Sequence, residues 1–276
     1  MPSPSMFVRF WGVRGSIPCP GPGKTRYGGH TSCVEVRCGD QILIFDAGSG
    51  IRVLGNALQA ENEARDIDLF FSHCHIDHLI GLPFFTPLFD DKYRLRLFSG
   101  HMKAQGGIAT AIDKLMSFPL FPVGIDMANA KLAFQDFDAG DILSPRPGIA
   151  IRTAPLLHPG GATGYRVEYQ GRSVAYLTDL EISASIDPRI VALANNADVL
   201  IVDATYTDDE LPQHEGWGHS SWQQAVRLAK QAHAKTLCLF HHDPDHDDDF
   251  MDRVAADAAA ALPGTIVAKD GLIIPL

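Results

Sequence analysis

The sequence predicts a layered α/β fold, and three observations lead to that prediction. Short apolar or β-branched runs recur along the chain and end abruptly in a polar residue, and amphipathic helical patterns separate some of them. No long Gly/Ser or Pro tract divides the chain. With 276 residues, of which 46% are hydrophobic, the chain can bury a full core. We therefore expect a single domain over residues 1–276.

Several apolar runs fit strands that are covered on both faces, because they are continuous instead of alternating. In chain order they are QILIF, IDLFFS, IAIRTAPLL, RSVAYLT, ADVLIV and AKTLCLF. Functional groups usually follow the carboxyl ends of such strands in layered α/β folds. The polar residues found at these ends are Asp46, His73, His158, Asp179, Asp203, His241 and His242.

Two of the gaps between these runs carry helix signals. Asp187 suits the N-cap of a helix, and Pro188 suits its first helical position. In the stretch 220–234, Ser220 followed by Gln223 three residues later predicts a capping box. The apolar positions that recur there at helical spacing, and so predict one buried face, are Trp222, Ala225, Val226 and Ala229.

The stretch 84–137 shows a less regular pattern than the rest of the chain. It contains several prolines and many aromatic residues, among them Phe84, Phe85, Phe89, Phe118 and Phe121. We expect an apolar insertion here, near the opening of the functional site, where it would form a lid or an apolar wall.

The charge balance bears on the partners of the protein. The formal net charge is −10, and no cluster of Lys and Arg is present that would neutralise a row of phosphates. Proteins that bind long nucleic acids normally show such a cluster, so we expect no long nucleic acid as a partner. Two bound divalent cations would return positive charge locally, so a small anionic substrate fits.

Signals for other compartments are missing from the sequence pattern. The first residues lack a cationic stretch followed by an apolar one, and no apolar run reaches the ~18 residues of a membrane span. The five cysteines include no CxxC pair, which is typical of reduced thiols. We expect a cytoplasmic protein without membrane contact, whose oligomeric state the sequence leaves open.

The run SHCHIDH carries the densest set of metal-binding side chains. His73 and His75 are two residues apart, so on an extended backbone they point the same way and can bind one cation together. Asp77 and His78 follow a turn and are placed for a second cation. Each cation needs about four donors. The donors that later strand ends can add are His158, Asp179 and His241.

A carboxylate can bridge two cations, and Asp179 is the best candidate for that role. His242 is the alternative to His241 as ligand. A donor set rich in nitrogen, with two carboxylates and no thiolate, favours Zn²⁺, with Mn²⁺ or Fe²⁺ as alternatives, over Ca²⁺ or Mg²⁺. Asp46 and Asp203 are candidates either for orienting a ligand histidine or for closing a turn. His219, just before a helix, is a candidate general acid or substrate contact.

The run from His73 to His78 resembles the signature of the metallo-β-lactamase fold superfamily, and the segments around His158, Asp179 and His241 resemble its later ligand motifs in the same order. The resemblance implies a four-layer αββα sandwich with two metal ions at one edge of the sheets. The stretch GHSSWQQAVRLAKQAHAKTLCLFHHDP is most similar to the ribonuclease Z and phosphodiesterase-type branch. On that analogy His219 is the proton donor and His241 the last ligand. Ser221 stands where that branch often has Thr.

The predicted activity is hydrolysis of a phosphodiester by a hydroxide held between two cations. Asp77 would hold or accept the proton of that water while also binding metal, and His219 would protonate the leaving oxygen. The expected substrate is a small diester such as a cyclic nucleotide. The alternative is hydrolysis of a lactone or thioester by the same site, with the apolar insertion binding the acyl chain. A third interpretation is a sensing module that binds metal without hydrolysis.

Overall fold

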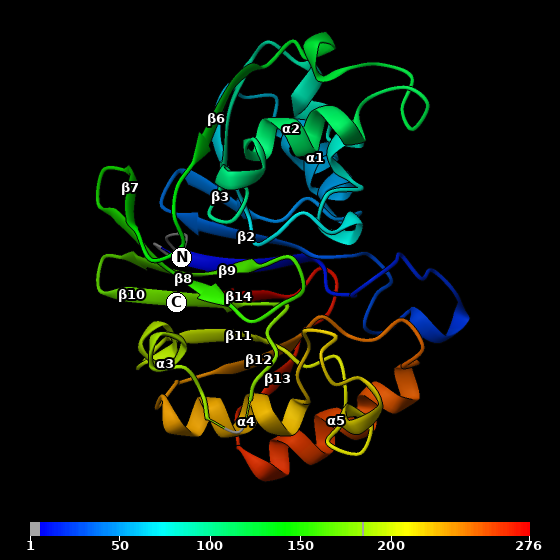
Figure 1. Cartoon of the computed structure of the whole chain (residues 1–276), viewed down its shortest axis with the longest axis vertical. Coiled ribbons are helices and arrows are strands. Elements are labelled where there is room, and N and C mark those ends of the chain that lie inside the picture. Colours follow the sequence, from blue (N-terminus) through cyan, green and yellow to red (C-terminus); the bar gives the residue numbers. More distant parts are fainter. Residues whose placement is uncertain (1–5, 184) are drawn as a thin grey trace.

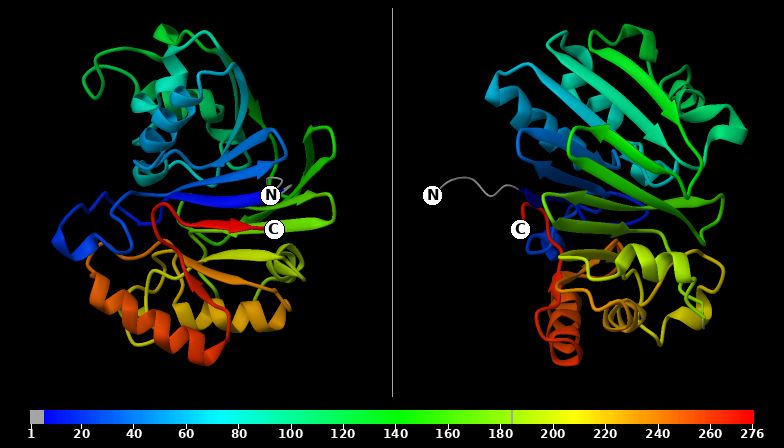
Figure 2. Two further views of the ribbon diagram at one scale, coloured as in Figure 1. Left: turned by 180° about the vertical axis from the view of Figure 1, so that it is seen from behind. Right: turned by 90° about the vertical axis from the view of Figure 1, so that its left-hand side faces the viewer.

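The computed structural model describes residues 6–183 and 185–276. Within these residues, two sheets pack face to face and helices cover their outer faces (Figures 1 and 2). The helices at the top of Figure 1 lie on one sheet and those at the bottom lie on the other. The four-layer αββα sandwich expected from the resemblance is therefore confirmed.

The first sheet has the strand order β14-β1-β2-β3-β4-β5-β6 among the described residues. Strands β14, β1, β2 and β3 pair antiparallel, whereas β3, β4, β5 and β6 pair parallel. The parallel strands therefore end at a common edge. The strands are β1 (Met6–Gly12), β2 (Cys33–Cys38), β3 (Gln41–Phe45), β4 (Arg65–Phe71), β5 (Tyr93–Ser99), β6 (Lys131–Asp136) and β14 (Ile273–Pro275).

The second sheet has the order β13-β12-β11-β10-β9-β8-β7 in the described part of the chain. Strands β7 to β10 form an antiparallel meander, and β10 to β13 run parallel. The strands are β7 (Ile142–Arg146), β8 (Ile149–Leu156), β9 (Ala162–Tyr169), β10 (Arg172–Leu177), β11 (Val199–Asp203), β12 (Leu237–Phe240) and β13 (Ile266–Val267).

Helices α1 (Ile51–Glu61) and α2 (Gly107–Leu115) pack on the first sheet. Helices α3 (Pro188–Ala194), α4 (Trp222–Gln231) and α5 (Asp248–Ala261) pack on the second. Short 3-10 helices occupy several connections: η1 (Pro22–Lys24), η2 (Ile76–His78), η3 (Leu82–Phe84), η4 (Thr86–Phe89), η5 (Lys103–Gln105), η6 (Ile125–Met127) and η7 (Leu211–Gln213).

The core has three apolar layers, one between the sheets and one under each set of helices. Strand β4 shows why a continuous apolar run was diagnostic. Leu69 and Phe71 face the helical layer, while Phe70 faces the second sheet and stacks on Phe45 with ring centroids 5.4 Å apart. Alternation along a strand places successive side chains on opposite faces, and here both faces are buried.

Two details differ from the sequence-based expectations. The N-cap of α4 is Ser221, which forms a capping box with Gln224, so the predicted Ser220–Gln223 box is one residue out of register. The stretch 84–137 is more regular than expected, because it contains β5, α2 and β6 of the first sheet. Its role at the opening of the site stays a prediction. Among the described residues, no helix has both the length and the apolar character needed to cross a membrane.

Candidate metal centre

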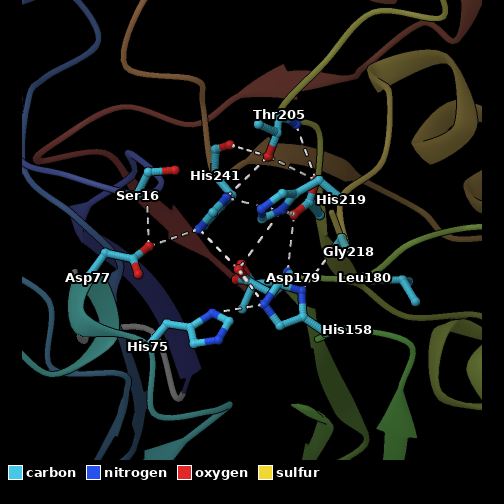
Figure 3. A network of polar contacts seen from close by, with 12 residues as sticks. Ser16, His75, Asp77, His158, Asp179, Leu180, Thr205, Gly218, His219 and His241 are labelled. Atoms are coloured by element: carbon cyan, nitrogen blue, oxygen red, sulfur yellow. Dashed lines mark hydrogen bonds and ion pairs between the residues drawn. The ribbon is translucent and has the colours of Figure 1, made fainter. Parts of the chain in front are cut away.

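The predicted metal ligands lie together at one edge of the sandwich, where strands of both sheets end. The first sheet contributes the segment after β4, which includes η2. The second sheet contributes the residues just beyond β8, β10 and β12. Figure 3 shows four of these residues, His75, Asp77, His158 and His241, around Asp179. The seven residues brought together are His73, His75, Asp77, His78, His158, Asp179 and His241.

One group of donors consists of His73, His75 and His158, whose ligand nitrogens lie within 4.8 Å of one another. His75 Nδ1 is 3.1 Å from His158 Nε2. His73 and His158 are buried, whereas His75 is exposed. This group therefore has one side that is accessible from solvent.

A second group consists of Asp77, His78 and His241, and it is buried. His78 Nε2 lies 3.2 Å from Asp77 Oδ2 and 3.4 Å from His241 Nε2. His241 Nε2 is also 3.3 Å from Asp77 Oδ2. The three side chains thus direct their donor atoms at one small volume.

Asp179 lies between the two groups. Its Oδ1 atom is 3.7 Å from the Nε2 atoms of His73 and His158 and 3.3 Å from His241 Nε2. Its Oδ2 atom is 3.2 Å from His78 Nε2. A carboxylate whose oxygens lie within 4 Å of donors in both groups is suited to bind two cations.

The donor set fits divalent cations. His73 Nε2 is buried without a hydrogen-bond partner, and such orphaned polar atoms are costly unless a ligand satisfies them. Imidazole nitrogens of different residues face each other at 3.1 and 3.4 Å, although only one of each pair can donate a proton. A shared cation would satisfy both lone pairs.

Three of the candidate ligand histidines are held through their second ring nitrogen. His78 Nδ1 donates to Asp46 Oδ2 at 2.9 Å, and His158 Nδ1 donates to the carbonyl oxygen of Gly218 at 2.9 Å. His241 Nδ1 is 3.1 Å from Thr205 Oγ1. These contacts fix each ring so that Nε2 faces the centre, as is usual around protein-bound metals.

Asp46 is the most heavily used of these anchors. It is buried and also accepts hydrogen bonds from the backbone N–H and the hydroxyl of Ser72 and from the hydroxyl of Tyr176. Its backbone is left-handed, with φ of 64°, as are those of Asp179 (φ 55°) and His241 (φ 60°). Non-glycine residues adopt this conformation only where the surroundings enforce it.

His219 forms a hydrogen bond through Nδ1 to Asp203 Oδ2 at 2.8 Å, directly beside the metal ligands. Burial lowers the pKa of His219, but the facing carboxylate of Asp203 outweighs it and raises that pKa to about 9. Asp203 is buried and also accepts backbone N–H groups from Asp179 and Ser220. The fixed Nδ1–H leaves Nε2 of His219 as the atom that faces away from Asp203.

The carboxylate of Asp77 is surrounded by two histidines and a backbone donor. Burial alone would raise its pKa, yet His78 and His241 hold the pKa well below its usual range. The backbone N–H of Ser16 donates to Asp77 Oδ2 at 2.8 Å. Ser16 has φ of 63°, and its neighbour Gly15 lies so close to the ring of His241 that a Cβ atom there would be 2.4 Å from it.

No sequence pattern indicates this contribution of Gly15 and Ser16, because they lie about 60 residues from Asp77 and form no motif with it. His242, the alternative ligand, faces away from the centre. Its Nε2 atom donates to the carbonyl oxygen of Ala268 at 2.8 Å, and burial lowers its pKa to about 3. His241 is therefore the histidine of this pair that the structure brings to the site.

A family model for the beta-lactamase superfamily domain matches residues 41–242, a span that contains every predicted ligand. The chain belongs to this superfamily. A ribonuclease Z from Haloarcula marismortui is 24% identical, with 97% of this chain and 96% of the relative covered.

Solved structures of the superfamily resemble the chain over nearly its whole length. The metallo-beta-lactamase fold protein YhfI from Bacillus subtilis has a TM-score of 0.72 at 21% identity, with 98% of each chain covered. The short form of human tRNase Z has a TM-score of 0.65 at 20% identity, with 97% of this chain and 98% of the other covered. The predictions of the superfamily and of a metal-dependent hydrolase are confirmed.

The expectation that long nucleic acids are excluded as partners is wrong. Superfamily relatives similar to almost the whole chain are ribonucleases by name, and one similar structure is a tRNase. Net charge is a sum over the whole surface, so a value of −10 does not describe the field at one edge of the sheets. Bound cations are often the largest local charges in a site and would dominate the field there.

Proposed function

We propose that this protein is a phosphodiesterase that holds two divalent cations. His73, His75 and His158 would hold one, and Asp77, His78 and His241 the other, with Asp179 shared between them. The observation that carries the proposal is the hydrogen-bonded pair of His219 and Asp203 beside this donor set. It adds a proton donor to a site that can bind the anionic part of a diester. The nitrogen-rich donors favour Zn²⁺, with Mn²⁺ and Fe²⁺ as alternatives.

When bound, the two cations would supply Lewis acidity, neutralising phosphate charge and acidifying a water molecule. Asp77 is positioned by the N–H of Ser16 and remains an acceptor, so it can orient the O–H of the attacking water. His219 keeps its Nδ1–H on Asp203 and can donate a proton from Nε2 to the leaving oxygen. Asp203 stabilises the imidazolium before the transfer and maintains its orientation afterwards.

The proposed substrate is a small diester, and a cyclic nucleotide is the first to test. The ribonuclease names of the relatives place RNA in the same panel. A competing function is acyl hydrolysis of a lactone or thioester. It is favoured by the exposed apolar side chains of Phe84, Phe118 and Leu120, which could bind an acyl chain.

The first experiment measures turnover of bis(p-nitrophenyl) phosphate by protein reconstituted with Zn²⁺ or Mn²⁺, beside His75→Ala. We expect metal-dependent turnover that the variant loses. Turnover of a lactone or thioester alone would replace the diesterase by the acyl hydrolase. Two bound cations with no turnover of any diester, RNA or acyl substrate would indicate a sensing module.

A second experiment tests the proton donor through the leaving group. p-Nitrophenolate leaves readily without a proton, whereas an alkoxide does not. We therefore expect His219→Ala to reduce turnover of an alkyl diester by about 10²–10⁴-fold, and to affect the p-nitrophenyl diester far less. An equal loss for both substrates would show that His219 is not the acid.

A further inference from the structure

A large aromatic side chain stands exposed next to the proposed proton donor. Trp217 is 58% exposed and precedes His219 by two residues. It lies outside the ligand set and the proposed mechanism, and no apolar layer of the core includes it. A solvated indole loses the free energy that its burial would contribute, so its position requires an explanation.

The backbone that carries this indole is held in place. The N–H groups of Gly216 and Gly218 donate to the carboxylate of Glu181 at 3.3 and 2.9 Å. The carbonyl oxygen of Gly218 accepts the Nδ1–H of His158, as Figure 3 shows. A Cβ atom at Gly218 would be 2.2 Å from His158 Nδ1, so the loop passes directly against a metal ligand. Trp217 is thus presented at the rim of the site from a fixed support.

A row of aromatic rings connects Trp217 to His219. The indole meets His214 edge-on, with ring centroids 4.9 Å apart, and His214 stacks on Tyr206 at 4.1 Å. Tyr206 in turn meets His219 at 6.0 Å. Tyr206 is buried, and His214 donates Nδ1–H to the carbonyl oxygen of Glu210 at 2.9 Å. The inner rings are therefore engaged, while the indole at the outer end keeps free surface.

The position of this surface limits what it can contact. A leaving group that receives its proton from His219 must lie on the His219 side of the centre, and the loop that carries Trp217 approaches the centre from that side through Gly218 and His219. Glu215 lies two residues before Trp217, and the carboxylate of Glu181 accepts the backbone N–H groups on either side of it. Their negative charges would repel a further phosphate group there. An uncharged planar ring would instead stack on the indole.

We propose that Trp217 stacks on a nucleobase carried by the leaving group of the diester, which makes this residue a specificity determinant of the site. The proposal rests on the proposed function, because it takes the side of the leaving group from His219. A nucleoside of a small diester and a nucleotide of an RNA strand offer the same planar ring. Both sources are therefore included in the test.

The test compares adenosine 5′-monophosphate with ribose 5-phosphate, which lacks only the base. Dissociation constants are measured by calorimetry on the metal-reconstituted protein and inhibition constants are measured against diester turnover. We expect Trp217→Ala to weaken binding of the adenine compound about tenfold and to leave ribose 5-phosphate unchanged. Trp217→Phe should retain most of the difference. Ile142→Ala, which removes an exposed apolar side chain on edge strand β7, is the control.

Equal effects of Trp217→Ala on both compounds, or no effect on either, would overturn the stacking proposal. A difference seen by calorimetry in a protein without diester turnover would support the base subsite while refuting the proposed function. Diester turnover together with equal binding effects of Trp217→Ala on the two compounds would support the proposed function and refute the base subsite. Turnover of 3′,5′-cyclic AMP and of adenylyl-(3′→5′)-adenosine then identifies the source of the base. Trp217→Ala should lower kcat/KM more for the type of diester on which the protein naturally acts.

Discussion

The two sheets contribute to the metal centre in different ways. The first supplies its donors from a single short segment after β4, from His73 to His78. The second supplies them singly, with His158 after β8, Asp179 after β10 and His241 after β12. The first contribution is determined locally. The second exists only once β10, β11 and β12 pair in parallel and end at one edge.

This difference indicates which donor side chains are most easily displaced from the centre. A local segment can lose one donor and keep the positions of the others, because the same few backbone residues hold them all. The strand ends of the second sheet depend on the register of several strands. Five substitutions, in four predictions, test this contrast and its limits, and they are given in order of decreasing expected effect on the centre.

The largest effect is expected at Asp179, the residue through which the second sheet reaches both donor groups. Asp179→Asn keeps the shape and tolerates the left-handed backbone but removes the charge. We expect loss of both cations and a fall in turnover of more than about 100-fold, since even residues that merely orient ligands cost 10–100-fold. Metal content and turnover are the measurements. Asp187→Asn, at the exposed N-cap of α3, should keep both cations.

Gly15→Ala should affect one donor group and spare the other. The new methyl group would lie 2.4 Å from His241 and displace its ring, while His73, His75 and His158 are untouched. We expect metal stoichiometry to fall from two to one, with little change in the folded state by circular dichroism. Gly21→Ala, which meets no atom within 4 Å, is the matched control. Retention of both cations in Gly15→Ala would show that the loop yields instead of His241.

The anchors of the two sheets can be compared directly. Asp46→Asn weakens the support of His78 in the first sheet, and Thr205→Val removes that of His241 in the second. Each should weaken metal binding by about 10–100-fold. Asp46→Asn should also lower the free energy of unfolding by about 1–3 kcal/mol, because Ser72 and Tyr176 lose a charged acceptor. A larger loss of stability in Thr205→Val would show that the hydrogen bonds from Ser72 and Tyr176 to Asp46 add little to the stability of the fold.

The smallest effect on the metal centre is expected at Asp270, which lies outside both donor sets. Burial raises the pKa of this carboxyl from 3.8 to about 7, although backbone N–H groups of His30 and Gly29 oppose the rise. Between pH 4 and 7 the unfolded chain is ionised here while the folded chain stays protonated, so the folded protein loses stability as the pH rises through this window. Asp270→Asn removes this loss. The melting temperature of this variant, relative to that of the parent, should rise between pH 5 and 8. A difference in melting temperature that does not change with pH would argue against the raised pKa.

Sequence patterns predicted the local features of the protein best. The candidate ligands from His73 to His78 lie in one recognisable run, and the strand ends carrying His158, Asp179 and His241 follow continuous apolar runs. The position of the α4 capping box was ambiguous, because Ser220 and Ser221 are each followed by a glutamine three residues later. Only the contact of Ser221 with Gln224 resolves it.

Features that join distant segments could not be predicted. The N–H of Ser16 meets Asp77 only after β1 and η2 have been brought together by the sheet, and no residue type announces a backbone donor. In 84–137, prolines and phenylalanines obscured the alternation Tyr93-Arg-Leu-Arg-Leu that marks β5. The partner prediction failed because a charge total carries no information on position.

The left-handed backbones of Asp46, Asp179 and His241 have a consequence for the life of the protein in a cell. A freshly synthesised chain must adopt these unfavourable conformations, and bring imidazoles to face one another, before a bound cation can stabilise them. Binding of cations to the folded chain then stabilises it by mass action. The unloaded chain is thus the form most open to proteolysis, so the supply of metal would set how much of the protein survives, in addition to how active each molecule is.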